Sequence, residues 1–180
     1  MVYKYRVTLA GIKGFFRVYA VNADNSLYTF HKQLRSDLEF PQDQQIFFKA
    51  LDAAGQVVAR YALIDLGYGA VDAVKISDTL KAGVASFVYY YDIQAKKSVI
   101  ITFEGECDEQ TLLPRLLESK GPVPLEFENG YVAFEDLPND RRKLPALGDD
   151  DDDDDEDDDE DDEDSDKDEE EIIYDESESI

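Results

Sequence analysis

The feature that most constrains this chain is an acidic run near its C-terminus, DDDDDDDEDDDEDDED, which occupies residues 149–164. The segment 149–180 holds 24 of the 43 acidic residues and one of the 18 basic residues, so it carries −23 of the net charge of −25. Like charges repel along such a segment, and its few apolar side chains bury too little surface to offset the entropy lost on ordering. We therefore predict a disordered acidic tail over residues 149–180.

The preceding part of the chain, residues 1–148, has the composition of a folded domain. It contains 19 acidic and 17 basic residues and is nearly neutral, and its length suits one domain with a single core. No window approaches the ~20 apolar residues of a membrane span, and the N-terminus lacks the apolar stretch of a signal peptide. The lone Cys107 has no partner for an internal disulfide, which agrees with a reducing compartment. These features predict a cytoplasmic protein without a membrane segment.

The first forty residues show the pattern of two strands followed by a helix. Residues 3–10 alternate in polarity, and residues 15–21 form a second apolar strand after the turn GIKG. The Asn and Ser of the next segment, DNS, suit a helix N-cap. Apolar residues then recur at helical spacing up to Pro41, namely Leu27, Phe30, Leu34 and Leu38. The sequence therefore predicts a β-β-α start.

Four further apolar segments predict two more strand pairs. Residues 45–51 and 56–63 flank the turn DAAG, and residues 86–93 and 98–105 flank QAKK. Short helical pieces are expected at 77–83, 108–119 and 131–137. Six strands and one clear helix indicate an α+β fold. We expect a single-domain α/β roll with a mixed or antiparallel sheet, with a β-grasp-like arrangement as the alternative.

The order of these segments resembles that of a known family. The segments are YRVTL, FRVYAV, LYTFHKQL, VKISDTLKAGVASFVYYYDI, and LLPRLLESKGPVP followed by GYVAFEDL. Together they are similar to the Ri-plasmid ORF-three-like family, whose members also occur as passenger proteins of insertion elements. The resemblance spans nearly all of residues 1–148 and implies an α/β-roll fold, with an association with plasmids and mobile elements in some relatives.

Individual positions both match and depart from the family pattern. Phe16-Arg17 stand at its Trp-Arg pair and His31 at its helix histidine. The strand with Tyr89 and Tyr91 ends in Tyr-Asp, as the family's does, at Asp92. After this position the chain reads IQAKKS, whereas the family continues Phe-Gly-Asp and then has a Trp and a His. The family's Cys-Pro-Pro-Glu-Asp and Gly-Gly segment is reduced to GPVPLEFENGY. The resemblance therefore implies a fold and no particular activity.

Few residues suit catalysis or metal binding. A structural zinc site needs four Cys or His ligands and a catalytic one about three, but the chain has only His31 and Cys107. The acidic run lacks the glycine turns of a defined calcium or magnesium site. We predict no metal and no cofactor. An enzyme of unknown reaction that uses Asp92 and His31 is the alternative. We interpret Asp92 as a turn residue and His31 as a locally hydrogen-bonded residue at the edge of the core.

Binding is the function that remains. Lys4, Arg6, Lys13 and Arg17 are predicted to form one basic patch beside Tyr19, an arrangement that suits single-stranded nucleic acid. The same composition is typical of an ordinary solvated strand face, and a near-neutral domain lacks the strongly basic surface of a dedicated nucleic-acid-binding protein.

The tail suggests what kind of partner is bound. A polyanion keeps a protein soluble, attracts a basic protein surface, or occupies the protein's own nucleic-acid surface. In the last case it would dock on the basic patch and on the basic residues 141–143, because tethering gives it a high effective concentration there. Ile172, Ile173 and Tyr174 resemble the apolar anchor of a docking peptide, or merely end the tail. We predict a non-enzymatic interaction module, with no membrane and no specific small molecule as partner.

Overall fold

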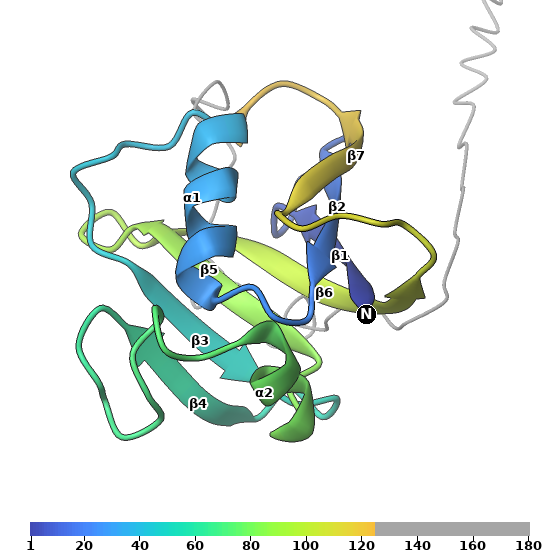
Figure 1. The fold of residues 1–180 in the computed structure, drawn as a ribbon. Coiled ribbons are helices and arrows are strands. Elements are labelled where there is room, and N and C mark those ends of the chain that lie inside the picture. The colour runs from blue at the N-terminus through green and yellow to red at the C-terminus, as the bar shows by residue number, and fades with distance from the viewer. Residues whose placement is uncertain (125–180) are drawn as a thin grey trace, which may run out of the picture. The chain divides into compact units, whose positions relative to one another are not determined.

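The computed structural model describes residues 1–124 (Figure 1). These residues form β1 (Val2–Thr8), β2 (Phe16–Asn22), α1 (Leu27–Asp37), β3 (Phe47–Leu51), β4 (Val57–Ala62), α2 (Ile76–Lys81), β5 (Ser86–Asp92), β6 (Lys97–Cys107) and β7 (Arg115–Lys120). The predicted β-β-α start and the six predicted strands are confirmed. The predicted tail and the helical piece at 131–137 lie outside the described residues.

The seven strands form one antiparallel sheet in the order β4-β3-β5-β6-β1-β2-β7. Three of the pairs join strands that follow each other along the chain, as in the β1–β2 hairpin, where Tyr5 pairs with Tyr19. The β1–β6 pair, in which Val7 lies opposite Ile101, joins the two halves of the sheet. The α+β prediction is therefore confirmed, with an antiparallel sheet.

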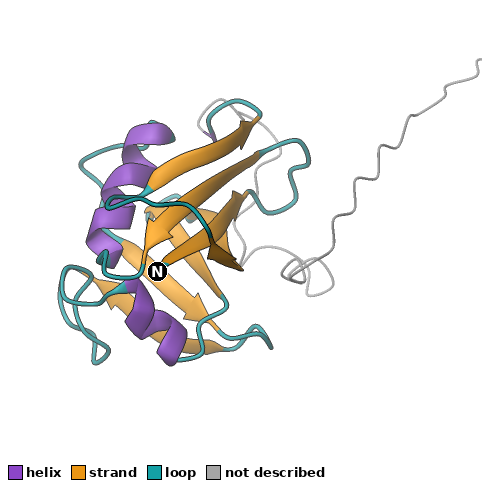
Figure 2. Cartoon of the chain, turned by 45° about the vertical axis from the view of Figure 1, so that its right-hand side comes forward, coloured by secondary structure: helices purple, strands orange, loops and turns teal. Residues whose placement is uncertain are grey.

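Helix α1 lies across one face of the sheet, and the main core fills the space between them (Figures 1 and 2). Its apolar residues at the predicted spacing are all fully buried, namely Leu27, Phe30, Leu34 and Leu38. The rings of Tyr5 and Tyr19 each lie 5.7 Å from the ring of Phe30. Burial of each such side chain contributes about 1.5–3 kcal/mol, so this face accounts for much of the stability of the domain.

The ends of α1 are set by local sequence. Ser26 is the N-cap, and its Oγ accepts a hydrogen bond of 3.1 Å from the Thr29 amide. At the other end Glu39 has a φ of 55°, and the Phe40 amide donates to the Arg35 carbonyl at 3.1 Å. This left-handed residue ends the helix just before Pro41, where the sequence predicts its end.

The segment after residue 108 differs from the prediction. A short helical piece was expected over 108–119, but Arg115–Lys120 form strand β7, which pairs with β2 through Phe16–Lys120 and Val18–Glu118. Pro114 separates this strand from the preceding loop. Helical propensity is a weak determinant, and the free edge of β2 supplies backbone hydrogen bonds that favour a strand here. Within residues 1–124 no helix has the length and apolar character needed to cross a membrane.

Candidate functional site

The most distinctive polar cluster lies between α1 and β5. His31 and Arg35 are four residues apart on α1, so both side chains project from the same helix face. The Tyr89 hydroxyl on β5 contacts both of them, at 2.8 Å from His31 Nδ1 and 3.2 Å from Arg35 Nε. All three side chains are buried. Two residues that match the family pattern, His31 and Tyr89, are thus in direct contact in the structure.

Burial sets the protonation of this cluster. Burial is the main cause of the lowered pKa of His31, and together with the cationic Arg35 and Lys32 it brings this pKa to about 4. Burial likewise raises the pKa of Tyr89 to about 12, although the Arg35 guanidinium opposes that rise. Both rings are neutral at pH 7. Because Tyr89 accepts a hydrogen bond from Arg35, we assign its own proton to the bond with His31 Nδ1, which leaves the histidine protonated on Nε2.

Arg35 extends the cluster to the loop that follows α1. Its Nη2 donates to the carbonyl of Gln44 at 2.7 Å and to that of Gln45 at 3.3 Å. Phe40 covers the neighbouring aromatic residues and stacks on the Tyr91 ring at 4.0 Å between centroids. The cluster therefore fixes α1, β5 and the segment before β3 together, which is a structural role.

Asp92 has a separate role at the end of β5. Its Oδ1 accepts a hydrogen bond of 2.9 Å from the Ala95 amide in the turn to β6. Lys96 in this turn has a φ of 55°. Asp92 therefore acts as a turn residue in the structure, while His31 bonds with Tyr89. The two candidate catalytic residues have different partners.

The predicted basic patch is divided between the two faces of the sheet. Arg6 lies opposite Val18 in the β1–β2 register, whereas Arg17 lies opposite Val7. Residues that are paired across an antiparallel ladder point to the same face, so Arg6 and Arg17 point to opposite faces. Lys13 is exposed in the turn between these strands.

Arg17 and Tyr19 are buried, so they do not belong to the surface patch that the sequence predicted. Arg17 donates to the Lys120 carbonyl at 2.6 Å and to the Gly121 carbonyl at 2.8 Å, and its guanidinium lies 4.7 Å from the centroid of the Phe15 ring. Tyr19 has no exposed surface. Arg17 therefore holds the end of β7 against β2, and Tyr19 fills the core.

Lys4 and Arg6 remain on the other face, where Glu104 of β6 neutralises much of their charge. Lys4 Nζ lies 3.4 Å from one carboxylate oxygen of Glu104, and Arg6 Nε donates to the other. The Arg6 guanidinium also lies 4.8 Å from the centroid of the Phe16 ring. The arrangement is a partly exposed charge triad on a strand face, with a net charge of +1.

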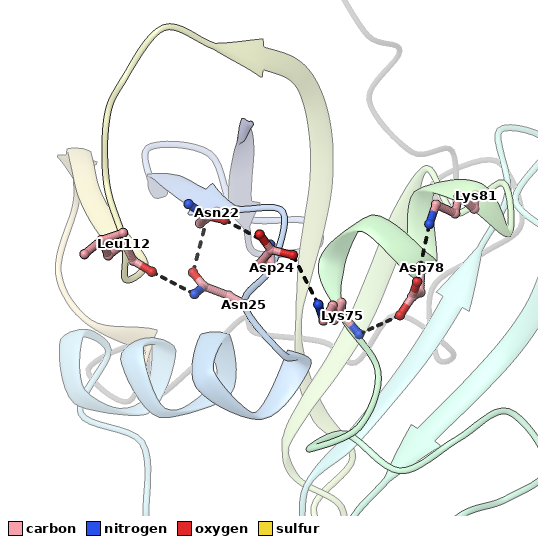
Figure 3. A network of polar contacts seen from close by, with 7 residues as sticks. All are labelled: Asn22, Asp24, Asn25, Lys75, Asp78, Lys81 and Leu112. Carbon is pink, nitrogen blue, oxygen red and sulfur yellow. Dashed lines mark hydrogen bonds and ion pairs between the residues drawn. The ribbon is translucent and has the colours of Figure 1, made fainter.

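Sequence patterns did not reveal a polar network around the turn between β2 and α1, which Figure 3 shows. The side-chain amides of Asn22 and Asn25 donate to the carbonyls of Thr111 and Leu112, at 2.9 and 2.8 Å. Asp24 forms an ion pair of 3.2 Å with Lys75 at the start of α2. The turn thereby joins the β6–β7 loop to α2. In the sequence, the Asn and Asp residues of this turn were the feature that could have indicated the network, because both residue types form hydrogen bonds readily with nearby backbone.

A shallow hollow of about 490 Å³ lies beside this network. Its walls include Met1, Asn22, Cys107 and Leu112. Within residues 1–124 no three His, Cys, Asp or Glu side chains gather as a metal site requires.

Comparisons with protein families and with solved structures show what this chain is similar to. The family model described as plasmid pRiA4b ORF-3-like protein matches residues 1–177. The chain belongs to this family. The crystal structure of a protein of unknown function from Methanosarcina mazei Go1 is 18% identical, with a TM-score of 0.55 over 68% of this chain and 70% of that chain. At this identity the likeness to the archaeal protein shows a shared fold alone. No curated protein matches the sequence. No function is thereby established for this ORF-3-like protein.

Proposed function

We propose that this ORF-3-like protein is a non-enzymatic interaction module whose acidic segment, residues 149–180, binds a basic protein surface. The observation that carries the proposal is the separation of charge along the chain. Residues 1–124 contain 14 acidic and 14 basic residues, whereas residues 149–180 carry −23. A charge of this size attracts cationic partners over about a Debye length, roughly 8–10 Å at physiological salt, and raises the rate of their association.

The polar residues of the described domain that were candidates for catalysis have structural partners. His31, Tyr89 and Arg35 satisfy one another and the backbone, and Asp92 stabilises a turn. General acid–base catalysis needs a group with its pKa near the working pH and within reach of substrate. His31 is buried, with a pKa of about 4. The enzyme alternative through Asp92 and His31 therefore has less support.

The alternative in which the acidic segment masks a nucleic-acid surface of the same chain also has less support. That surface was predicted to contain Lys4, Arg6, Lys13, Arg17 and Tyr19. Two of these residues are buried, and two others share the Glu104 carboxylate. The remaining charge is small for a site that must compete for phosphates.

The anchor residues Ile172, Ile173 and Tyr174 give the proposal its specificity. Electrostatic attraction alone distinguishes basic partners poorly and weakens with salt, whereas burial of three apolar side chains in a groove persists. We propose that the acidic residues speed the encounter and that these three residues hold the complex.

A pull-down with the full-length protein tests the proposal. The matched variants replace Asp149–Asp155 by Asn, or Ile172, Ile173 and Tyr174 by Ser. Nuclease-treated lysate should still yield a basic partner with the parent chain, the Asn variant should retain less of it at low salt, and the Ser variant less at high salt. If both variants retain the same partners as the parent, the proposal is wrong. Loss of every partner on nuclease treatment would instead indicate nucleic acid.

A further inference from the structure

The two edges of the sheet differ in their protection against pairing with another strand. At one edge, β7 has the sequence RLLESK, in which three of six residues are charged. At the other edge, β4 has the sequence VVARYA, with Arg60 as its one charge and no proline. No other strand in residues 1–124 pairs with the outer side of β4 (Figure 1). Charged residues and proline are the usual defences of an edge strand, so β4 is open to further pairing.

An exposed apolar loop follows this open edge directly. Leu63, Ile64, Leu66 and Tyr68 are 58%, 70%, 42% and 48% exposed, and Val57 at the start of β4 is 41% exposed. Monomeric proteins rarely display large apolar side chains in such a cluster, and clusters of this kind mark interaction surfaces.

The loop has a defined conformation. Asp65 Oδ1 accepts hydrogen bonds from the amides of Gly67 at 2.7 Å and Gly69 at 2.9 Å. Both glycines have φ values near 100°, which favours glycine at these positions. The Val71 amide then donates to the Ala62 carbonyl at 2.9 Å and closes the loop at the end of β4. The backbone that carries the apolar side chains therefore has a defined conformation, which lowers the entropy cost of forming an interface there.

We propose that two copies of this chain associate through β4, which pairs with β4 of the second copy in an antiparallel orientation and extends both sheets into one. The inference goes beyond the proposed role of the acidic segment and rests on different residues.

The distribution of apolar residues along β4 favours a second copy as the occupant. In an antiparallel two-fold pair, the end of one strand lies beside the start of the other. The exposed Leu63 and Ile64, which follow β4, would thereby meet the exposed Val57 of the second copy. The same surface supplies both halves of the contact. Because the Ala62 carbonyl already accepts from Val71, new backbone bonds are confined to residues 57–61.

Charge gives this association an unusual salt dependence. Each copy carries a net charge of −25, so two copies repel each other at low ionic strength. Added salt screens this repulsion but leaves backbone pairing and apolar burial largely intact. Self-association should therefore strengthen with salt, whereas the binding of a basic partner should begin to weaken. The opposite trends separate failure of this inference from failure of the proposed function.

Sedimentation equilibrium of the full-length protein tests the inference. At about 500 mM NaCl we expect a concentration-dependent dimer that is at least about tenfold tighter than at about 50 mM NaCl. The double variant Ile64→Lys/Leu66→Lys alters only exposed side chains and should weaken the dimer at least about tenfold. The matched control is Leu112→Lys/Leu113→Lys, which places the same charges at exposed residues outside β4 and its loop and should dimerise like the parent. Thermal unfolding confirms that each variant is folded.

Three results would overturn the inference. They are a parent chain that stays monomeric at both salt concentrations, a dimer that tightens as salt is lowered, and equal weakening by the two double variants. Hydrogen exchange gives an independent measurement, because amides in residues 57–61 should become protected as the protein concentration rises. Unchanged exchange across a concentration range in which the dimer forms would place the interface elsewhere.

Discussion

At the scale of single residues, the domain uses its only histidine as a neutral structural group. His31 accepts a hydrogen bond from Tyr89, which in turn accepts from the buried Arg35. A protonated imidazole has no acceptor nitrogen, so protonation of His31 would break this chain of bonds beside a guanidinium. The position that matches the family's helix histidine therefore has a physical role that requires no catalysis.

A pH dependence of stability follows from the lowered pKa of His31. The pKa is about 4 in the folded chain, against an ordinary value of 6.5, so the unfolded chain binds the proton more readily between these values. The stabilisation is fully present above pH 6.5 and is lost as the pH falls toward 4, by up to about 3 kcal/mol. Urea unfolding at several pH values should show this slope. His31→Gln should flatten it, and an equally steep slope in that variant would assign the dependence to other groups.

Arg17 and Arg6 provide a second prediction, because they differ in burial. Arg17→Met leaves the carbonyls of Lys120 and Gly121 without their donor and should cost about 2–4 kcal/mol. Arg6→Met breaks a partly exposed ion pair with Glu104 and should cost less than about 1 kcal/mol. Urea unfolding of the two variants gives the comparison. Equal losses would mean that Arg17 does not act as a buried clamp.

The same pair shows where sequence patterns reach their limit at this scale. Alternation indicates which residues of one strand share a face, and it placed Tyr5 and Val7 together. It does not give the register between two strands, so Arg6 and Arg17 were assigned to one patch. The β1–β2 register separates them, and burial of Arg17 depends on β7, a strand that local patterns did not indicate.

At the scale of elements, local signals predicted what local forces determine. The Ser26 cap and the spacing of leucines defined α1 because both act within the helix. The segment Arg115–Lys120 becomes a strand because β2 offers it a free edge, which is a non-local cause. The polar network of Asn22 and Asn25 also has a non-local cause, because its hydrogen bonds join residues about 90 positions apart in the sequence.

This network predicts how the β6–β7 loop is held. The double variant Asn22→Ala/Asn25→Ala removes the donors to Thr111 and Leu112. It should raise amide exchange of residues 111–117 by about thirtyfold, since two bonds of roughly 1 kcal/mol each are lost. The amides of Phe30 and Leu34 within α1 serve as the internal control and should exchange as in the parent. A uniform increase across the domain would indicate global destabilisation and contradict a local clamp.

At the scale of the whole molecule, the net negative charge and the apolar core belong to different parts of the sequence. The described residues 1–124 have equal numbers of acidic and basic residues, and their core is built from apolar side chains between α1 and the sheet. The segment 149–180 has few apolar residues to contribute to any core. Stability and the proposed binding to a basic partner should therefore vary independently, because the core residues determine the first and the acidic segment is proposed to determine the second.

The independence of these two properties is itself testable. Replacing Asp149–Asp155 by Asn removes seven negative charges and no apolar surface, so the melting temperature at about 150 mM NaCl should change by less than about 2 °C. At low salt the variant should melt slightly higher than the parent, because repulsion among like charges is then less screened and favours expansion. Differential scanning calorimetry at both salt concentrations measures this. A large loss of stability at moderate salt would show that the acidic segment is bound by the domain.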